Sequence, residues 1–388
     1  MCGWSRGAAA GRMQAWRVHA YGAGELRLES ARVPALRAPD DVLVRVHATS
    51  LNPLDVAMIG GYGATILNIL RKLEGSDVEF PLVVGRDFAG EVALAGASAR
   101  VRRGARVWGV VPPQRAGAHA QYVLVKDRWL GPAPSALSTL EAGGALYAAL
   151  SACAALRVAA PGGRWRGVRV LLLGLGGVGH AALQLLVHRG AQVVVGCSGD
   201  LCEKATSLGA VAALDRHSPD YDRLLEEAGP YEVIVDCAGL GGEAAAARRW
   251  QFARYVTLSS PLLREADARG AAAGALAAAA TLARQCAAAA RAASAASAAS
   301  ACPPPHVRWA YFMPSAADIE MLRRLADQGK FTVAVERAYA WRRGAEAYAR
   351  AAAGGGRGKL LLDFTDDSAP DASDTSDTSD TSDARRRD

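Results

Sequence analysis

The sequence contains few cysteines, and their spacing suits neither a disulfide framework nor a structural metal site. There are 7 in 388 residues, an odd number, and no pair has Cys-x-x-Cys spacing. This pattern argues against a disulfide framework and against a zinc knuckle, and a reducing compartment is expected. The cysteines are Cys2, Cys153, Cys197, Cys202, Cys237, Cys286 and Cys302.

Long apolar runs are also absent. No stretch of 18 or more purely apolar residues predicts a membrane span, and the alanine-rich segment 266–301 is interrupted by Arg284, Gln285 and Arg291. Alanine itself drives membrane insertion only weakly. We therefore expect no membrane span, while peripheral association with a membrane is compatible with the sequence.

Acidic residues are missing from the beginning of the chain. The first is Glu25, whereas residues 1–12 contain Arg6 and Arg12. Acid-poor segments that contain arginine are typical of mitochondrial transit peptides. This segment is short, so an unstructured N-terminus is the alternative interpretation.

Basic residues are in excess but are not concentrated in one place. The formal net charge is +7, and arginines are spread along the chain up to the final run at 385–387. A diffuse positive balance suits anionic cofactors and does not by itself indicate nucleic acid. We predict no nucleic-acid partner; a coding bias towards alanine, glycine and arginine is an alternative origin of the basic character.

Hydrophobic patterning divides the chain into two regions. With 388 residues, 51% of them apolar, the chain can form two domains with sizeable cores. Residues 13–150 contain short alternating segments, such as 41–48 and 85–92, separated by glycine and proline. This is typical of an irregular, largely antiparallel β domain. Residues 303–365 are expected to return to this domain.

Residues 151–302 have a different pattern, in which continuous apolar strands alternate with helical segments. Such strands are buried on both faces, so we predict a doubly wound parallel sheet and an α/β fold. Segment 266–301 is expected to be a helix that passes into a mobile insert, because it has few large apolar side chains. The Ser/Asp/Thr repeats of 366–388 cannot bury a core and are expected to be disordered.

A glycine-rich segment marks a dinucleotide site. Residues 174–179 read Gly-Leu-Gly-Gly-Val-Gly, directly after an apolar strand and directly before a helical run. This is the context that a G-x-G-x-x-G match requires. Gly174, Gly176 and Gly179 would allow a tight turn, so that backbone amides approach a pyrophosphate at the helix N-terminus. A glycine-rich turn in an unrelated α/β fold is the alternative.

The second strand of this unit has no carboxylate at its tip. NAD-dependent enzymes usually place an acid about 20 residues after the glycine loop, where it binds the ribose 2′-hydroxyl. Here the strand ends at Ser198, which would tolerate a 2′-phosphate, and Lys204 and Arg216 are available as cations. The sequence therefore favours NADPH over NADH. Asp200 opposes this interpretation, and Lys204 is equally compatible with a solvated helix position.

Ligands for a catalytic zinc ion are not apparent in the β domain. His19, His47 and His119 lack ligand spacing, and the nearest cysteine, Cys153, follows the domain. Without zinc, deprotonation of an alcohol is difficult. An activated acceptor such as a quinone or an α,β-unsaturated carbonyl needs little help from a Lewis acid. We predict no metal ion.

Several short segments of the chain match a known family. They are residues 13–16, 50–55, 61–65, 80–87, 108–113, 255–258, 308–310 and 357–359. Through them, residues 13–365 resemble the zinc-free quinone oxidoreductase (ζ-crystallin-like) branch of the medium-chain dehydrogenases/reductases. In zinc-dependent relatives, the segment at Asn52 carries a cysteine ligand and the Gly-Arg-Asp segment at 85–87 reads Gly-His-Glu.

The resemblance implies a GroES-like catalytic domain, formed by 13–150 and 303–365, and a Rossmann domain at 151–302. It further implies an NAD(P)H-dependent quinone reductase in mitochondria that is linked to ubiquinone metabolism. A reticulon is implied as a candidate protein partner, and oligomer formation is compatible with the sequence.

The resemblance also assigns site residues. It places Asn52, Asp55 and Tyr62 at the mouth of the cleft between the domains, where Asn52 or Tyr62 would stabilise a developing oxyanion. Turn chemistry at Asn52 and loop anchoring by Tyr62 are the alternatives. Two departures are Arg216, where a tyrosine is usual, and Ile59, where an arginine is usual. The implied NADPH site consists of Gly176, Gly177, Val178, Gly179, Ser198, Leu258, Arg357, Gly358 and Lys359.

Three functions therefore remain open: a quinone reductase, an enoyl-thioester reductase with the same hydride geometry, and a weakly active NADPH-binding scaffold that acts through a partner. A basic rim for coenzyme A phosphates would favour the second, and no such cluster is apparent near Tyr62. The insert and the tail would suit the third.

Overall fold

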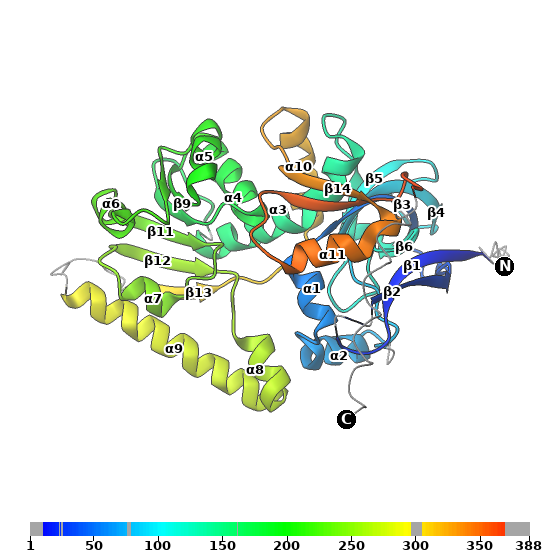
Figure 1. Cartoon of the computed structure of the whole chain (residues 1–388), viewed down its shortest axis with the longest axis horizontal. Coiled ribbons are helices and arrows are strands. Elements are labelled where there is room, and N and C mark those ends of the chain that lie inside the picture. The colour runs from blue at the N-terminus through cyan, green and yellow to red at the C-terminus, as the bar shows by residue number, and fades with distance from the viewer. Residues whose placement is uncertain are drawn as a thin grey trace, which may run out of the picture.

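Two large β-sheets, one in each region of the chain, organise the computed structural model, with helix α3 (Thr139–Ala159) between them (Figure 1). The predicted leader and tail fall almost entirely outside the described residues. The structure describes residues 11–22, 24, 26–75, 79–160, 162–295 and 305–368.

One sheet has six parallel strands in the order β10-β9-β8-β11-β12-β13. This order, in which the first strand β8 (Arg169–Leu173) lies in the middle, is that of doubly wound dinucleotide-binding folds. The predicted α/β fold is therefore confirmed. The other strands are β9 (Gln192–Cys197), β10 (Ala212–Asp215), β11 (Tyr231–Asp236), β12 (Phe252–Thr257) and β13 (His306–Trp309), and the helices include α4 (Gly177–His188), α5 (Cys202–Ser207), α6 (Tyr221–Glu227) and α7 (Gly242–Ala246).

The other sheet is mixed, in the order β14-β15-β3-β4-β5-β7, and β6 also pairs with β3. Its longest strand, β3 (Asp41–Leu51), has register shifts where it pairs with β4, which fits the irregular β domain expected. The other strands of this sheet are β4 (Asp87–Ala95), β5 (Arg106–Val110), β6 (Tyr122–Lys126), β7 (Leu130–Pro132), β14 (Val335–Ala340) and β15 (Lys359–Asp363). Strands β1 (Arg12–Val18) and β2 (Leu26–Arg32) pair with each other in a separate antiparallel sheet. The helices of this region include α1 (Pro53–Ile59), α2 (Ala64–Leu73) and α11 (Gly344–Ala352).

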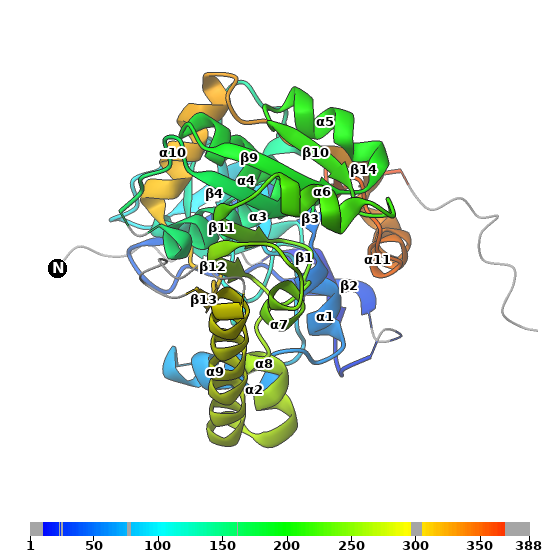
Figure 2. The ribbon, with the colours of Figure 1, turned by 90° about the vertical axis from the view of Figure 1, so that its left-hand side faces the viewer.

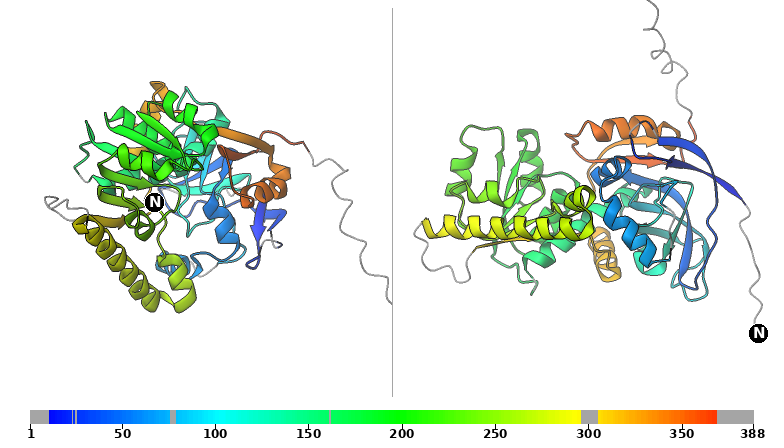
Figure 3. Two further views of the ribbon diagram at one scale, coloured as in Figure 1. Left: turned by 60° about the vertical axis from the view of Figure 1, so that its left-hand side comes forward. Right: turned by 90° about the horizontal axis from the view of Figure 1, so that it is seen from below.

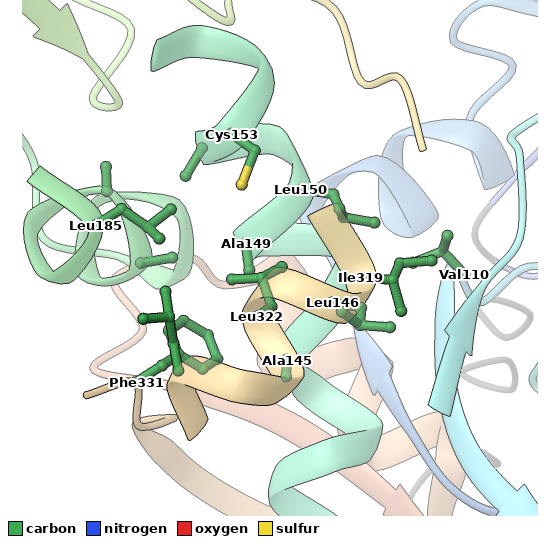
Figure 4. Close-up of a cluster of buried hydrophobic side chains, with 14 of the residues drawn as sticks. Val110, Ala145, Leu146, Ala149, Leu150, Cys153, Leu185, Ile319, Leu322 and Phe331 are labelled. Atoms are coloured by element: carbon green, nitrogen blue, oxygen red, sulfur yellow. The ribbon is translucent and has the colours of Figure 1, made fainter. Parts of the chain in front are cut away.

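Helix α3 joins the two cores. Ser138 and Glu141 begin it with a capping box, in which the Ser138 N–H donates to the Glu141 carboxylate at 2.9 Å. The helix contacts strands of both sheets. Figure 4 shows α10 (Ala316–Asp327) crossing it, with Leu322 and Ile319 beside Ala149 and Leu146. One continuous hydrophobic core therefore runs from the β domain into the parallel sheet.

The structure corrects the predicted return of all of 303–365 to the β domain. Strand β13 pairs in parallel with β12, so it is the last strand of the parallel sheet. The reason is burial, because Val307 is packed among apolar side chains that include Tyr255 and Trp250. The chain crosses back only after this strand.

The alanine-rich segment is better packed than its composition predicts. It forms helices α8 (Leu262–Arg269) and α9 (Ala271–Ala295), and the second lies along the parallel sheet (Figures 2 and 3). Small side chains let the two backbones approach closely, since a Cβ on Gly274 would lie 2.4 Å from the Ala266 nitrogen. Helix α9 also contacts β13 and α7. The remainder of the predicted mobile insert, 296–301, lies outside the described residues.

Two segments of the described chain are long and apolar enough to be candidate membrane spans by length and composition. They are α3, and the pair α1–α2 taken together despite a 91° bend. The most apolar window of α3 is 83% buried inside the protein, as expected for a core helix.

Candidate functional site

The glycine-rich segment forms the turn between β8 and α4, in the context that the sequence predicts. Gly174 has a φ of +89°, which residues with a Cβ rarely adopt. A Cβ on Gly179 would lie 2.0 Å from the Gly174 carbonyl oxygen, whereas one on Gly176 would meet no atom within 4 Å. The first turn of α4 thus packs closely against the end of β8. The space next to Gly176, at the N-terminus of the helix, stays open, as an anion site requires.

A narrow pocket of about 20 Å³ lies beside this loop and is lined by residues of both domains. Lys204 enters it from α5, and Lys359 enters it from the start of β15. Basic side chains at the N-terminus of a helix suit a polyanionic ligand. Six of the predicted cofactor residues line this pocket, namely Gly176, Gly177, Lys204, Arg357, Gly358 and Lys359.

A second pocket, of about 370 Å³, contains two more predicted residues, Gly174 and Arg216. Arg248 and Trp250 also line it. The remaining predicted cofactor residues do not line either pocket. Gly179 lies inside the turn, Ser198 is buried after β9, and Val178 and Leu258 are half-buried against the core.

An ion pair crosses the cleft beside the first pocket. Nε of Arg357, from the loop before β15, lies 2.5 Å from the Asp200 carboxylate, just after β9. Both side chains are about half exposed. Asp200, whose negative charge was the argument against NADPH, is thus paired with a cation from the other domain.

Asn52 and Asp55 lie deeper than their predicted place at the mouth of the cleft. Both are buried at the N-terminus of α1, where the Asp55 carboxylate accepts the Asn52 N–H at 2.8 Å. The Asn52 amide oxygen accepts from Lys359 at 2.5 Å, and its NH₂ group contacts Asp87 at 3.3 Å. The polar atoms of these two residues are therefore engaged inside the protein, because they cap the helix that follows.

Arg86 provides a buried cation next to this network. It is fully buried, and its Nε lies 3.4 Å from the Asp55 carboxylate. Burial lowers the pKa of its guanidinium, while the Asp55 charge opposes that shift. Its two NH₂ groups donate to backbone carbonyl oxygens of Val83, Pro112, Pro113 and Arg115.

The arrangement around Arg86 is unfavourable for a metal ion. In the part of the chain that the structure describes, no group of three or more His, Cys, Asp or Glu side chains could hold one. His119 is buried and its ring nitrogens contact Tyr348 and the Ser50 carbonyl oxygen. A divalent cation near Asp55 would also meet the positive charge of Arg86.

Aromatic side chains continue from the buried network towards the surface. The Tyr147 N–H donates to Asp87 at 3.1 Å, and the Tyr147 ring contacts Phe312, with 4.6 Å between centroids. Tyr62 and Tyr147 are half-buried, and neither hydroxyl makes a hydrogen bond within the described residues. Burial raises the pKa of both phenols, so they are protonated at neutral pH.

Sequence reasoning missed Tyr147, Phe312 and the cation Arg86. Tyr147 lies within an apolar helical run, and no spacing distinguishes it from a core residue. The sequence did mark Arg86 as unusual, because the resemblance aligns it with a histidine of zinc-dependent relatives. Its contacts, however, could not be predicted.

This geometry defines a class of protein, a two-domain oxidoreductase with a nucleotide loop at the cleft between a GroES-like and a Rossmann domain. Comparisons with known proteins agree. Residues 38–135 match the family "Alcohol dehydrogenase GroES-like domain", and residues 208–362 match "Zinc-binding dehydrogenase".

Individual relatives cover nearly the whole chain. "NAD(P)H oxidoreductase RTN4IP1, mitochondrial" of Drosophila melanogaster is 36% identical over 92% of this chain and 88% of that protein. "Reticulon-4-interacting protein 1, mitochondrial" of Caenorhabditis elegans is 31% identical over 91% and 95%. A solved quinone oxidoreductase from Coxiella burnetii superposes with a TM-score of 0.69 at 22% identity, covering 91% and 99% of the two chains.

The chain belongs to the NAD(P)H oxidoreductase family of these mitochondrial relatives, within the medium-chain dehydrogenases/reductases. It is therefore an oxidoreductase with a nicotinamide cofactor, and its location is mitochondrial.

The contact at Gly179 generates a first prediction. In Gly179→Ala, the new Cβ overlaps the Gly174 carbonyl oxygen, so the turn must open and its amides lose their alignment. We expect nucleotide affinity to fall at least tenfold, or about 1.4 kcal/mol, in a fluorescence titration with NADPH and NADH. The matched control is Gly162→Ala, whose Cβ meets nothing within 4 Å. Unchanged affinity for both nucleotides would contradict the assignment of the loop.

His180 generates a second prediction, because it lines the first pocket and burial lowers its pKa from 6.5 to about 4. Between these values the unfolded chain binds a proton that the folded protein does not. The free energy of unfolding therefore decreases as the pH falls from about 6.5 to about 4. His180→Asn should reduce this decrease by an amount on the order of 3 kcal/mol, measured by urea unfolding at several pH values. An identical pH dependence in the variant would argue against a buried neutral histidine.

Proposed function

We propose that the protein is an NADPH-dependent oxidoreductase that reduces a quinone-like acceptor without a metal ion. The observation that carries this proposal is the convergence of the glycine loop with Lys204, Arg357 and Lys359 in one pocket. A continuous set of contacts then leads from Lys359 through Asn52 and Asp87 to Tyr147. Nucleotide phosphates and a planar acceptor would thus occupy adjoining parts of the same cleft.

The preference for NADPH rests on charge at the end of β9. Ser198 ends the strand without a carboxylate, and Lys204 faces the first pocket. Asp200, the nearest acid, is paired with Arg357 and so repels a phosphate less than a free carboxylate would. Either Lys204 or Arg216 could pair with the 2′-phosphate.

Reduction of a quinone needs a hydride, a proton and stabilisation of an oxyanion. A bound reduced nicotinamide supplies the hydride. Tyr62 and Tyr147 have hydroxyls without protein partners in the described structure, so either can donate a hydrogen bond to the acceptor oxygen. The proton that completes the quinol would come from Tyr62 or from water. Because Asn52 is engaged with Lys359 and Asp87, the donor role predicted for it passes to the tyrosines.

The metal-free part of the proposal rests on Arg86. Its guanidinium neutralises Asp55 inside the protein and crosslinks the loop at 112–115 through backbone carbonyl oxygens. This cation occupies the place where a metal would need acidic or histidine ligands. The oxyanion must then be stabilised by hydrogen-bond donors, which favours acceptors that are already activated.

The biological setting is also inferred. One relative is named for an interaction with reticulon-4, and we extend to this chain a reticulon as candidate partner. A quinone acceptor in mitochondria further links the proposed activity to ubiquinone metabolism.

Oxidation of NADPH by the purified protein tests the proposed acceptor. We expect oxidation to accelerate at least tenfold with a soluble ubiquinone analogue, and to remain near background with an enoyl thioester or with no acceptor. Acceleration by the enoyl thioester alone would favour an enoyl-thioester reductase. Tight nucleotide binding without turnover of either acceptor would favour a scaffold.

The preference between nucleotides is tested by Ser198→Asp. A carboxylate at the end of β9 would repel a 2′-phosphate and accept a hydrogen bond from a 2′-hydroxyl. The affinity ratio of NADPH to NADH should fall at least tenfold, or about 1.4 kcal/mol. Ser98→Asp adds the same charge at an exposed site in the β domain and should leave the ratio unchanged. An unchanged ratio in Ser198→Asp would remove the argument for NADPH.

A further inference from the structure

The turn that carries Tyr62 lacks a cap of its own. Tyr62 lies between Gly61 and Gly63, and Gly63 is the N-cap residue of α2 with a φ of +83°. Serine, threonine, aspartate or asparagine usually fills this position, because its side chain accepts a hydrogen bond from the first turn. Glycine cannot do so, and the exposed amides of α2 need an acceptor from elsewhere.

Asp267, which belongs to α8 in the other domain, supplies that acceptor. Its carboxylate accepts the Gly63 N–H at 2.6 Å and the Thr65 N–H at 3.0 Å. A negative charge at this end of a helix is also favoured by the helix dipole. Leu263 of α8 approaches from the same side, since a Cβ on Gly63 would lie 3.4 Å from it. Helices α2 and α8 are accordingly in contact, as Figures 1 and 2 show.

The surroundings of the Tyr62 phenol come from the same segment. The charge of Arg264 acts on this phenol and opposes the increase in its pKa that burial causes. Tyr311 also raises the pKa of this phenol. The Tyr311 hydroxyl lies 2.8 Å from the Ser260 hydroxyl, just before α8. The nucleotide-binding domain therefore forms one wall around a tyrosine of the β domain.

We propose that Asp267 is a positioning residue, which holds Tyr62 at the acceptor side of the cleft by capping α2 from the nucleotide-binding domain. Helices α8 and α9 thereby gain a function, because the tight packing of α9 against α8 supports Asp267. The inference rests on the proposed function, in that it takes Tyr62 to be the donor to the acceptor oxygen. Asp267 accepts hydrogen bonds only from backbone N–H groups of this turn, and its charge adds to the increase in the pKa of the Tyr62 phenol.

Hydrogen exchange tests the contact without reference to activity. In Asp267→Ala, the amides of Gly63 and Thr65 lose their acceptor, so exchange of residues 61–66 should accelerate at least tenfold. The matched control is Glu265→Ala on the same helix, whose carboxylate pairs with Arg269 at 2.7 Å. Unchanged exchange in Asp267→Ala would overturn the inference whether or not quinones are substrates.

A double-mutant cycle tests the link to Tyr62. Asp267→Ala should lower kcat with the ubiquinone analogue at least fivefold while the Kd for NADPH stays within about twofold, and Tyr62→Phe should lower kcat as well. If Asp267 acts through Tyr62, the double variant should be no slower than Tyr62→Phe alone.

Multiplicative losses in the double variant would identify a general structural effect and overturn the positioning role. Full activity of Tyr62→Phe would do the same. Absence of quinone reduction in the unmodified protein would instead remove the proposed function.

Discussion

The proposed nucleotide site depends on one steric constraint, the contact between Gly179 and the Gly174 carbonyl oxygen. Any Cβ at position 179 would lie within 2.0 Å of that oxygen, so α4 can begin against the end of β8 only with glycine there. That close approach orients the first amides of α4 towards the cleft. Lys204, Arg357 and Lys359 then add positive charge around a region that is already suited to anions. The charges alone, without the turn, would be a diffuse basic surface.

The buried charges next to the cleft are arranged so that each cation lies near a carboxylate. Arg86 and Lys359 are both buried, and burial lowers the pKa of each, so nearby negative charge is needed to offset the cost of burying two cations. Asp55 and Asp87 provide it, and Asn52 links the pairs through its amide. Removing one member would leave an uncompensated charge inside the protein, which is far more costly than losing a surface ion pair. The network also supports Tyr147, whose N–H donates to the Asp87 carboxylate.

The parts of the fold that could be predicted are those determined by local patterns. Strand β8, the glycine turn and α4 follow from consecutive residues. The continuous apolar strands expected within 151–302, such as β11, could be predicted because nearly every residue of such a strand is buried. Strand β13 was assigned to the wrong domain because four residues carry little pattern, and its partner β12 is far away in sequence.

The candidate site was less predictable, because burial and pairing depend on the tertiary structure. Asn52 and Asp55 were predicted at the mouth of the cleft, whereas both are buried. Their capping of α1 and their contacts with Lys359 and Gly85 join segments that no local pattern connects. Tyr147 had no signal at all within an apolar helix. The packing of helix α9 was underestimated, because close contacts between alanine and glycine residues leave no hydrophobic pattern in the sequence.

Two contacts between the domains hold the proposed nucleotide pocket and the turn of Tyr62 in place relative to each other. Asp200 and Arg357 meet beside the nucleotide pocket, and Asp267 caps α2 beside Tyr62. In each case a carboxylate of the nucleotide-binding domain holds a group of the β domain. Helix α3 packs in the hydrophobic core that the two domains share. The position of the tyrosine is consequently tied to the domain that holds the glycine loop, although the two lie on different parts of the chain.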